Sequence, residues 1–214
     1  MSGPTTTTMI EVYADLWCPF AHVGLRAAHR QRRLLERSDV AVQVRAWPLE
    51  LVNGRPMEPA AVLVQVEHLQ EHVAPDMFRD VAKDNFPGAT LEALALVERA
   101  YRVDCETGFR ASLVLRDALF ERGQDISDPS VLASVARALG VASPDDTDRE
   151  AVLADWREGE RRGVVGSPHF YCGAESIFCP ALQITRAPTG EVAIRRDAAR
   201  LNLFLEHCLA DQLS

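Results

Sequence analysis

The sequence predicts an α/β domain that is interrupted by a long helical segment. Three observations support this fold class. A strand, a helix and a second strand follow one another before residue 47, and the long stretch after residue 56 has helical patterns without a convincing strand. Strand patterns return from residue 164 and precede a last helix. The predicted order is therefore a β-α-β half, a helical insertion and a β-β-α half.

The first half is predicted from the spacing of apolar residues. Residues 9–14 predict a strand, and residues 40–44 alternate valine with other side chains and predict a second one. Between them, residues 19–36 place apolar side chains at helical spacing among Arg and Gln. A helical crossover between two strands favours parallel pairing.

The middle of the chain is predicted to be helical throughout. Asp128 before Pro129, and Ser143 before Pro144, have the pattern of an N-cap followed by proline at the first helical position. Helices are expected at 60–73, 76–85, 91–107, 109–122, 129–139 and 144–162. So many helices are too much for a simple crossover, and we interpret residues 57–162 as an inserted helical subdomain.

The last part of the chain returns to strands. Strands are expected at 164–171 and 177–179 around a turn at 173–176, then at 182–186 and 192–195 around a turn at 187–190, before a helix at 198–210. A β-α-β half and a β-β-α half around one sheet form the thioredoxin arrangement. We therefore predict a thioredoxin-like fold in which residues 9–56 and 163–214 make one domain around the insertion.

Composition excludes several classes of function. The net charge of -8 gives no electrostatic support for nucleic-acid binding. No apolar run approaches the ~20 residues that span a bilayer, so no membrane partner is expected. Residues 1–8 lack the basic and apolar regions of a signal peptide, which favours the cytoplasm. Lys83 is the single lysine beside many arginines, a bias that suggests a GC-rich bacterial genome.

The cysteines do not form a disulfide framework, because their number is odd and their spacing is scattered. They stand at Cys18, Cys105, Cys172, Cys179 and Cys208. We expect Cys105 and Cys208 to be core residues on helices. If residues 173–176 make a four-residue turn, Cys172 and Cys179 lie diagonally across a hairpin, about 7 Å apart. That distance is too long for an unstrained disulfide, so ordinary strand thiols are favoured over a functional pair.

Cys18 is the candidate nucleophile. It follows a strand and precedes Pro19, which suits the first position of a helix. Unpaired N–H groups and the helix dipole there favour the thiolate, so we expect a lowered pKa. His22, one turn further on, is expected to stabilise the thiolate or to donate a proton. Trp17 and Phe20 offer an apolar wall, whereas the simpler interpretation is a small, inert core cysteine.

A second segment supports a functional role for this cysteine. Ser167 and Pro168 lie within the segment 164–171 that predicts a strand, and a proline that opens a strand cannot donate a ladder hydrogen bond. In the thioredoxin arrangement such a proline is cis and lies beside the active cysteine. His169 follows it, either as a strand residue that faces away or as a substrate contact.

Three segments resemble one family. Residues 15–24 (DLWCPFAHVG), 47–53 (WPLELVN) and 163–170 (GVVGSPHF) resemble DsbA-like thiol-disulfide oxidoreductases of the FrnE type. The resemblance extends to 2-hydroxychromene-2-carboxylate isomerases and kappa-class glutathione transferases, which have serine at the first motif position. It implies a thioredoxin-like fold with Cys18 as the reactive cysteine, and we expect His22, from its position one turn further on, to be the second catalytic residue. It also implies substrate contacts by Trp17, Pro19, Phe20, Asn53, Ser167, Pro168 and His169.

The motif departs from the oxidoreductase pattern at Ala21, where the family has its second cysteine. Cys18 therefore cannot close a disulfide within its own motif. Monothiol chemistry remains, in which Cys18 forms a mixed disulfide that an external thiol resolves. We expect no tightly bound cofactor and no metal, a small thiol such as glutathione or mycothiol as co-substrate, and a small thiol or disulfide as substrate. A homodimer is the oligomer that we consider.

Two other functions stay open. In the first, Cys18 activates a bound thiol without redox change, as in a glutathione-dependent isomerase or transferase. In the second, the protein is a non-catalytic thioredoxin-like module whose insertion binds a partner protein, and Ala21 keeps this alternative alive. His68, Glu71 and His72 match a zinc-peptidase spacing, but no third ligand is identified and the stretch has the composition of an exposed helical face.

Overall fold

The computed structural model describes residues 8–37, 39–81, 86–180, 182–186 and 192–210. Its strands are β1 (Thr8–Ala14), β2 (Val40–Ala46), β3 (His169–Cys172), β4 (Glu175–Phe178), β5 (Leu182–Arg186) and β6 (Val192–Arg196). Its helices are α1 (Pro19–Leu34), α2 (Leu49–Val52), α3 (Pro59–His72), α4 (Leu91–Tyr101), α5 (Cys105–Arg122), α6 (Pro129–Leu139), α7 (Asp146–Arg161) and α8 (Ala198–Ala210).

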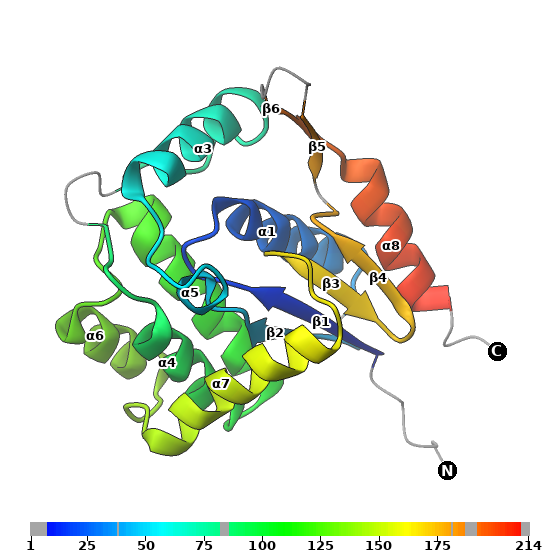
Figure 1. Cartoon of the computed structure of the whole chain (residues 1–214). Coiled ribbons are helices and arrows are strands. Elements are labelled where there is room, and N and C mark those ends of the chain that lie inside the picture. The colour runs from blue at the N-terminus through cyan, green and yellow to red at the C-terminus, as the bar shows by residue number, and fades with distance from the viewer. Residues whose placement is uncertain (1–7, 38, 82–85, 181, 187–191, 211–214) are drawn as a thin grey trace, which may run out of the picture.

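Within the described residues, the main sheet has four strands in the order β2-β1-β3-β4. The β1 and β2 strands are parallel from Thr8 opposite Val40 to Ala14 opposite Ala46, as the helical crossover predicts. The β3 strand is antiparallel to β1, and β4 is antiparallel to β3. This arrangement confirms the predicted thioredoxin-like fold. Figure 1 shows helices α4 to α7 gathered beside β2, away from β4 and α8.

The second hairpin does not join the main sheet. The β5 and β6 strands pair antiparallel as predicted, but they form a separate two-stranded ribbon among the described residues. The reason lies at the end of β4, where Cys179 has a positive φ of 48° and Pro180 follows. A proline cannot donate to the ladder, so the chain leaves the sheet there. The predicted turn at 187–190 lies outside the described residues.

The first hairpin has a different register from the predicted one. Gly173 takes a positive φ of 59°, and β3 and β4 are joined through Gly173 and Ala174 alone. Two-residue hairpin turns require such a left-handed conformation, which glycine adopts without strain. Cys172 therefore lies opposite Glu175 and not opposite Ile177. The predicted diagonal placement of Cys172 and Cys179 is wrong.

Residues 76–81, the described part of the predicted helix 76–85, are not helical; residues 82–85 lie outside the description. The backbone groups of this segment bind side chains from its neighbours. Gln70 Nε2 donates to the carbonyl oxygens of Met77 and Phe78, at 3.2 and 3.5 Å, and the Phe78 N–H donates to Glu121 Oε1 at 2.9 Å. Phe78 also has a positive φ of 63°, which a helix does not accommodate.

Helix starts in the insertion depend on aspartates. Asp128 caps α6 as predicted. The predicted helix 91–107 is divided, because Asp104 accepts the Thr107 N–H at 2.7 Å and starts α5. The last helix begins after Asp145, which forms a capping box with Asp148, and not after Ser143. A carboxylate that accepts N–H groups of the first turn stabilises a helix start more than a nearby serine that makes no such bond.

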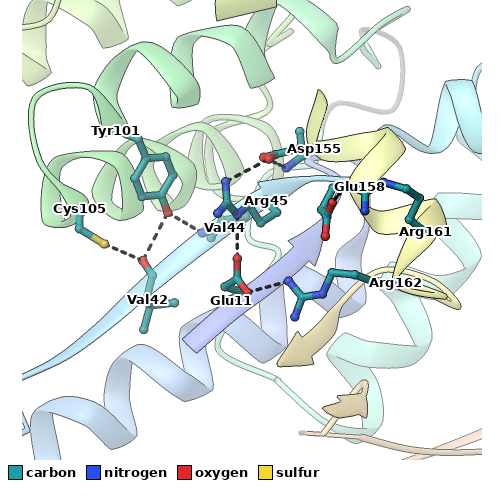
Figure 2. Close-up of polar contacts among 11 residues, drawn as sticks. Glu11, Val42, Val44, Arg45, Tyr101, Cys105, Asp155, Glu158, Arg161 and Arg162 are labelled. Atoms are coloured by element: carbon teal, nitrogen blue, oxygen red, sulfur yellow. Dashed lines mark hydrogen bonds and ion pairs between the residues drawn. The ribbon is translucent and has the colours of Figure 1, made fainter. Parts of the chain in front are cut away.

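Ion pairs join the helical insertion to the sheet (Figure 2). Arg45 on β2 contacts Glu11 on β1 at 3.0 Å and Asp155 on α7 at 3.1 Å, while Arg162 contacts Glu11 at 2.7 Å. Asp155 also accepts the Ala46 N–H at 3.0 Å. We call Glu11, Arg45, Asp155 and Arg162 the Arg45 network. In the described part of the chain, no helix is long and apolar enough to cross a membrane.

Candidate active site

Cys18 stands between β1 and the first turn of α1. It is the N-cap residue of α1, and Pro19 opens the helix. The side chain is 4% exposed, and its Sγ–H donates to the Ser167 carbonyl oxygen at 3.0 Å. The Ser167–Pro168 peptide bond is cis. Two segments 149 residues apart in sequence therefore meet at the sulfur atom.

The acidity of this thiol differs from the expectation. Burial raises the pKa of Cys18, although Ser167, the Ala21 amide and the Arg116 guanidinium act in the opposite direction. The expected lowering of the Cys18 pKa is therefore wrong. The helix start does favour the thiolate, but removal of the sulfur from water outweighs it.

The sulfur borders a cavity of about 260 Å³, which we call the thiol cavity. One part of its wall consists of the first turn of α1, α2 with the loop that follows it, and α3. The loop before β3 and the end of β4 form the other part. The lining residues are Cys18, Pro19, Phe20, Leu49, Asn53, Met57, Gln65, Ser167, Phe178 and Cys179. Five predicted site residues thus share this cavity: Cys18, Pro19, Phe20, Asn53 and Ser167. None of the described residues that line it is Asp, Glu, Lys or Arg, so an apolar or neutral polar group suits it.

His22 does not point its ring toward this cavity's lining. Its Nε2 lies 2.9 Å from Glu121 Oε1, and the ring packs between Phe78 and Phe120. Burial lowers the pKa of His22, which is fully buried. In the described part of the chain no side-chain hydrogen bond or ion pair joins His22 to Cys18; only its backbone N–H donates to the Cys18 carbonyl, at 3.1 Å.

The other three predicted substrate contacts, Trp17, Pro168 and His169, are buried outside the cavity lining. Trp17 is fully buried and stacks on Phe86 with ring centres 6.2 Å apart. Pro168 is buried and lies against Gly24 of α1. His169 Nδ1 accepts the Val165 N–H at 3.3 Å, and burial lowers the pKa of its imidazole. None of these three side chains is part of the cavity lining.

Asp15 is a central residue of the site to which the sequence analysis gave no role. Its carboxylate accepts the N–H groups of Trp17 and Leu49, both at 2.6 Å, and its own N–H donates to Ser167 Oγ at 2.9 Å. These bonds tie together the three segments that carry the family resemblance. Burial raises the pKa of Asp15 to about 6. The signal was present, since Asp15 is the aspartate that begins the matched motif.

Arg116 was also missed, because it lies in the insertion, where no motif matches. The side chain is fully buried on α5, and its Nη1 donates to the Asp15 carbonyl at 2.5 Å. Burial lowers the pKa of Arg116 to about 10, while the charges of Cys18 and Asp15 raise it. Nη2 has no hydrogen-bond partner among the described residues. A buried guanidinium near Cys18 stabilises a thiolate there. The apolar residues Leu113 and Phe120, about one helical turn before and after it, were the available clue.

Cys179 is the last missed residue. The sequence pattern favours an ordinary strand thiol at this position, yet Cys179 lines the thiol cavity with Cys18 and is 3% exposed. Burial raises the pKa of Cys179 to about 12, and the negative charge of Cys18 acts in the same direction. The two thiols are therefore near enough to influence each other's ionisation.

The fold and the site together define a thioredoxin-fold protein with a single cysteine at the motif helix. The sequence profile of the DSBA-like thioredoxin domain matches residues 9–184. The chain belongs to this DsbA-like family, whose activities are of the thiol oxidoreductase or isomerase kind. No curated protein sequence matches the chain.

Solved structures agree on the fold. A candidate protein disulfide isomerase from Nitrosomonas europaea is 18% identical over 96% of this chain and 98% of its own, with a TM-score of 0.70. The cytosolic disulfide reductase DsbM from Pseudomonas aeruginosa is 16% identical over 94% and 98%, with a TM-score of 0.65. A 2-hydroxychromene-2-carboxylate isomerase is 15% identical over 79% and 88%, with a TM-score of 0.59. At such identities the likeness establishes the fold and no more.

Proposed function

We propose that the protein is a thiol-disulfide oxidoreductase in which Cys18 forms a mixed disulfide with a small thiol or a thiol-bearing substrate. The observation that carries the proposal is the position of the Cys18 sulfur, at the wall of the thiol cavity and against the Ser167 carbonyl. Ala21 stands where the second motif cysteine would be, so the covalent partner must come from outside the motif.

The reaction follows from the site residues. The Cys18 thiolate attacks one sulfur of a disulfide, the new bond forms at Cys18, and the second sulfur leaves as a thiolate that takes up a proton. Arg116 stabilises the reacting thiolate, because it is a buried cation whose charge lowers the pKa of Cys18. The Ser167 carbonyl, released from the thiol, can accept an N–H group of a peptide-like substrate. Trp17, Pro168 and His169 hold this wall in place, and His22 acts through the helix and not on the sulfur.

A small thiol such as glutathione or mycothiol is the proposed co-substrate. A peptide-like thiol has the backbone groups that the Ser167 carbonyl and Asn53 could bind. One DsbM structure, 16% identical with a TM-score of 0.66, is described as being with GSH. Because DsbM is described as cytosolic, we also propose the cytoplasm of a bacterium as the compartment, with a small-molecule partner, no nucleic acid or membrane partner, and no bound metal or cofactor.

The second candidate is a glutathione-dependent isomerase or transferase. The cavity without charged lining favours it, since such a site suits an apolar co-substrate beside a bound thiol. In that reaction Cys18 would orient or activate the thiol without changing its own oxidation state.

The test is glutathione-dependent reduction of a small disulfide, 2-hydroxyethyl disulfide, followed by NADPH consumption with glutathione reductase. We expect turnover by the protein and a fall to background in Cys18→Ser. The matched control is Cys105→Ser, which changes a half-buried thiol on α5 and should keep full activity. Turnover that persists in Cys18→Ser would refute the assignment. No turnover with the protein folded would favour the isomerase or the non-catalytic alternative.

A further inference from the structure

The thiol cavity contains a second sulfur atom that the proposed monothiol reaction leaves unused. Cys18 and Cys179 both line the cavity, and both are almost fully buried, at 4% and 3% exposure. They come from opposite halves of the chain, so no sequence motif joins them. Cysteine is often an inert core residue, and burial alone therefore does not assign a role to Cys179.

The hairpin fixes where Cys179 lies. The register places His169 opposite Phe178, the last residue of β4, so Cys179, which follows that strand, faces Pro168. The Cys179 N–H donates to the Pro168 carbonyl at 2.9 Å, while the Cys18 thiol donates to the Ser167 carbonyl at 3.0 Å. The Cys18 thiol and the Cys179 backbone N–H therefore bind the carbonyl groups of two consecutive residues, Ser167 and Pro168. Cys18 lies at the start of α1, and Cys179 lies directly after β4.

The backbone of Cys179 is held on both sides. Its carbonyl accepts the Leu182 N–H at 3.1 Å, in addition to the bond that its N–H donates to Pro168. Its φ of 48° is a left-handed conformation that a non-glycine residue adopts only where the surroundings impose it. These contacts keep the Cα atom in place, so the Cys179 sulfur can approach Cys18 only by a change of its χ1 rotamer.

We propose that Cys179 is the resolving thiol of Cys18, in place of the second cysteine that the motif lacks. The inference rests on the proposed function, because it requires that Cys18 first forms a mixed disulfide. The Cys179 sulfur then bonds to the Cys18 sulfur, and the bond between Cys18 and the small thiol breaks. The Cys179 proton goes to the released small thiol, whose sulfur is reduced while that of Cys179 is oxidised. Two further small thiols, as the reductant, reopen the Cys18–Cys179 disulfide and leave as their own disulfide.

The charges in the cavity set the order of these steps. Burial raises the pKa of Cys179, and the negative charge of a Cys18 thiolate raises it further, so ionisation of Cys18 disfavours ionisation of Cys179. Once Cys18 is joined to a small thiol, that charge is gone and Cys179 ionises more readily. Arg116, a buried cation, lowers the pKa of the Cys18 thiol before the mixed disulfide forms. Cys18 is therefore the attacking residue and Cys179 the resolving one.

The experiment uses glutathione disulfide as the probe on the reduced full-length protein. Samples are quenched with acid over time and followed by intact mass, then digested without reduction to map linked peptides. In the wild type we expect glutathione to add at Cys18 and then to leave, with a Cys18–Cys179 linked peptide as product. In Cys179→Ser we expect the mixed disulfide to persist at least about tenfold longer. Cys172→Ser, a change in the same hairpin, should behave as the wild type.

The outcomes separate the two proposals. A mixed disulfide at Cys18 with the same lifetime in the wild type and in Cys179→Ser would overturn the resolving role and leave the proposed function standing. A linked pair of Cys172 and Cys179 would overturn it as well. Absence of any mixed disulfide at Cys18 would overturn both. If Cys179→Ser fails to fold by circular dichroism, the linked peptide of the wild type decides alone.

Discussion

The thiol cavity lies beyond the end of β1, while the Arg45 network includes Glu11 on that strand, and the two regions treat charge in opposite ways. In the network, each carboxylate faces a guanidinium: Arg45 lies between Glu11 and Asp155, and Arg162 contacts Glu11. In the cavity, the sulfur of Cys18 is bound to a neutral carbonyl, and the lining carries no charged side chain among the described residues. One region pairs its charges, and the other keeps its reactive group neutral.

This difference teaches what each region does. Paired and hydrogen-bonded charges are costly to disrupt, so the Arg45 network holds α7 of the insertion against β1 and β2. A buried thiol without a charged side chain in contact with it is inert until a disulfide reaches it or its proton is removed. Arg116 brings a buried positive charge close to the second region, where it lowers the pKa of Cys18 against the effect of burial.

The largest effect is expected from breaking the network. Asp155→Ala leaves the Arg45 guanidinium and the Ala46 N–H without their partner, so the free energy of unfolding should fall by about 3 kcal/mol. Urea unfolding measures it. Arg55→Ala, in an exposed ion pair with Glu58, is the control and should cost less than about 1 kcal/mol. A network without structural importance would give equal losses.

A smaller effect is expected from removing the buried cation beside the sulfur. Arg116→Met should raise the pKa of Cys18 further and slow its reaction with glutathione disulfide at pH 8 by about tenfold, as one pKa unit implies. Arg116→Lys keeps the charge and should recover most of the rate. If the methionine and lysine variants, both shown to be folded, slow the reaction equally, packing and not charge explains the effect.

The smallest effect concerns the pH dependence of stability through Glu98, on which Asp155 of the Arg45 network acts. Burial and the charge of Asp155 raise the pKa of Glu98 to about 8. Folded Glu98 thus keeps a proton that the unfolded chain loses above its ordinary value of 4.5. Between these values the folded state binds more protons, so stability falls as pH rises. Glu98→Gln has no such proton and should lose less stability from pH 5 to pH 8. Equal losses in both proteins would contradict the assignment.

Local patterns predicted much of the fold. The β-α-β half, the parallel pairing and the bounds of α6 follow from apolar spacing and from the Asp128 cap, which act over a few residues. The sequence could not predict the register of the first hairpin, because the conformation of one glycine, Gly173, decides it. It predicted the place of Cys18 but not its pKa, since burial depends on segments far away in the chain.

The candidate site was predicted in part for the same reason. The predicted fold brings the Cys18 motif and the Ser167–Pro168 loop together, and five of the predicted residues line one cavity. They are Cys18, Pro19, Phe20, Asn53 and Ser167. His22 shares the helix with Cys18, but Glu121 and Phe78 from the insertion surround its ring. Residues that tertiary packing alone brings to the sulfur, such as Arg116 and Cys179, carry no local signal that ties them to it.

The rate of glutathione addition at each cysteine, measured by peptide mass spectrometry from pH 6 to pH 10, tests the central claim most directly. The account predicts that Cys18 reacts ahead of the half-buried Cys105, because of the two only Cys18 lines the cavity in which we propose that the disulfide binds. It also predicts that the Cys18 rate still rises above pH 9, because burial raises the pKa of this thiol. Faster addition at Cys105, or a Cys18 rate that is level between pH 6 and pH 8, would contradict it.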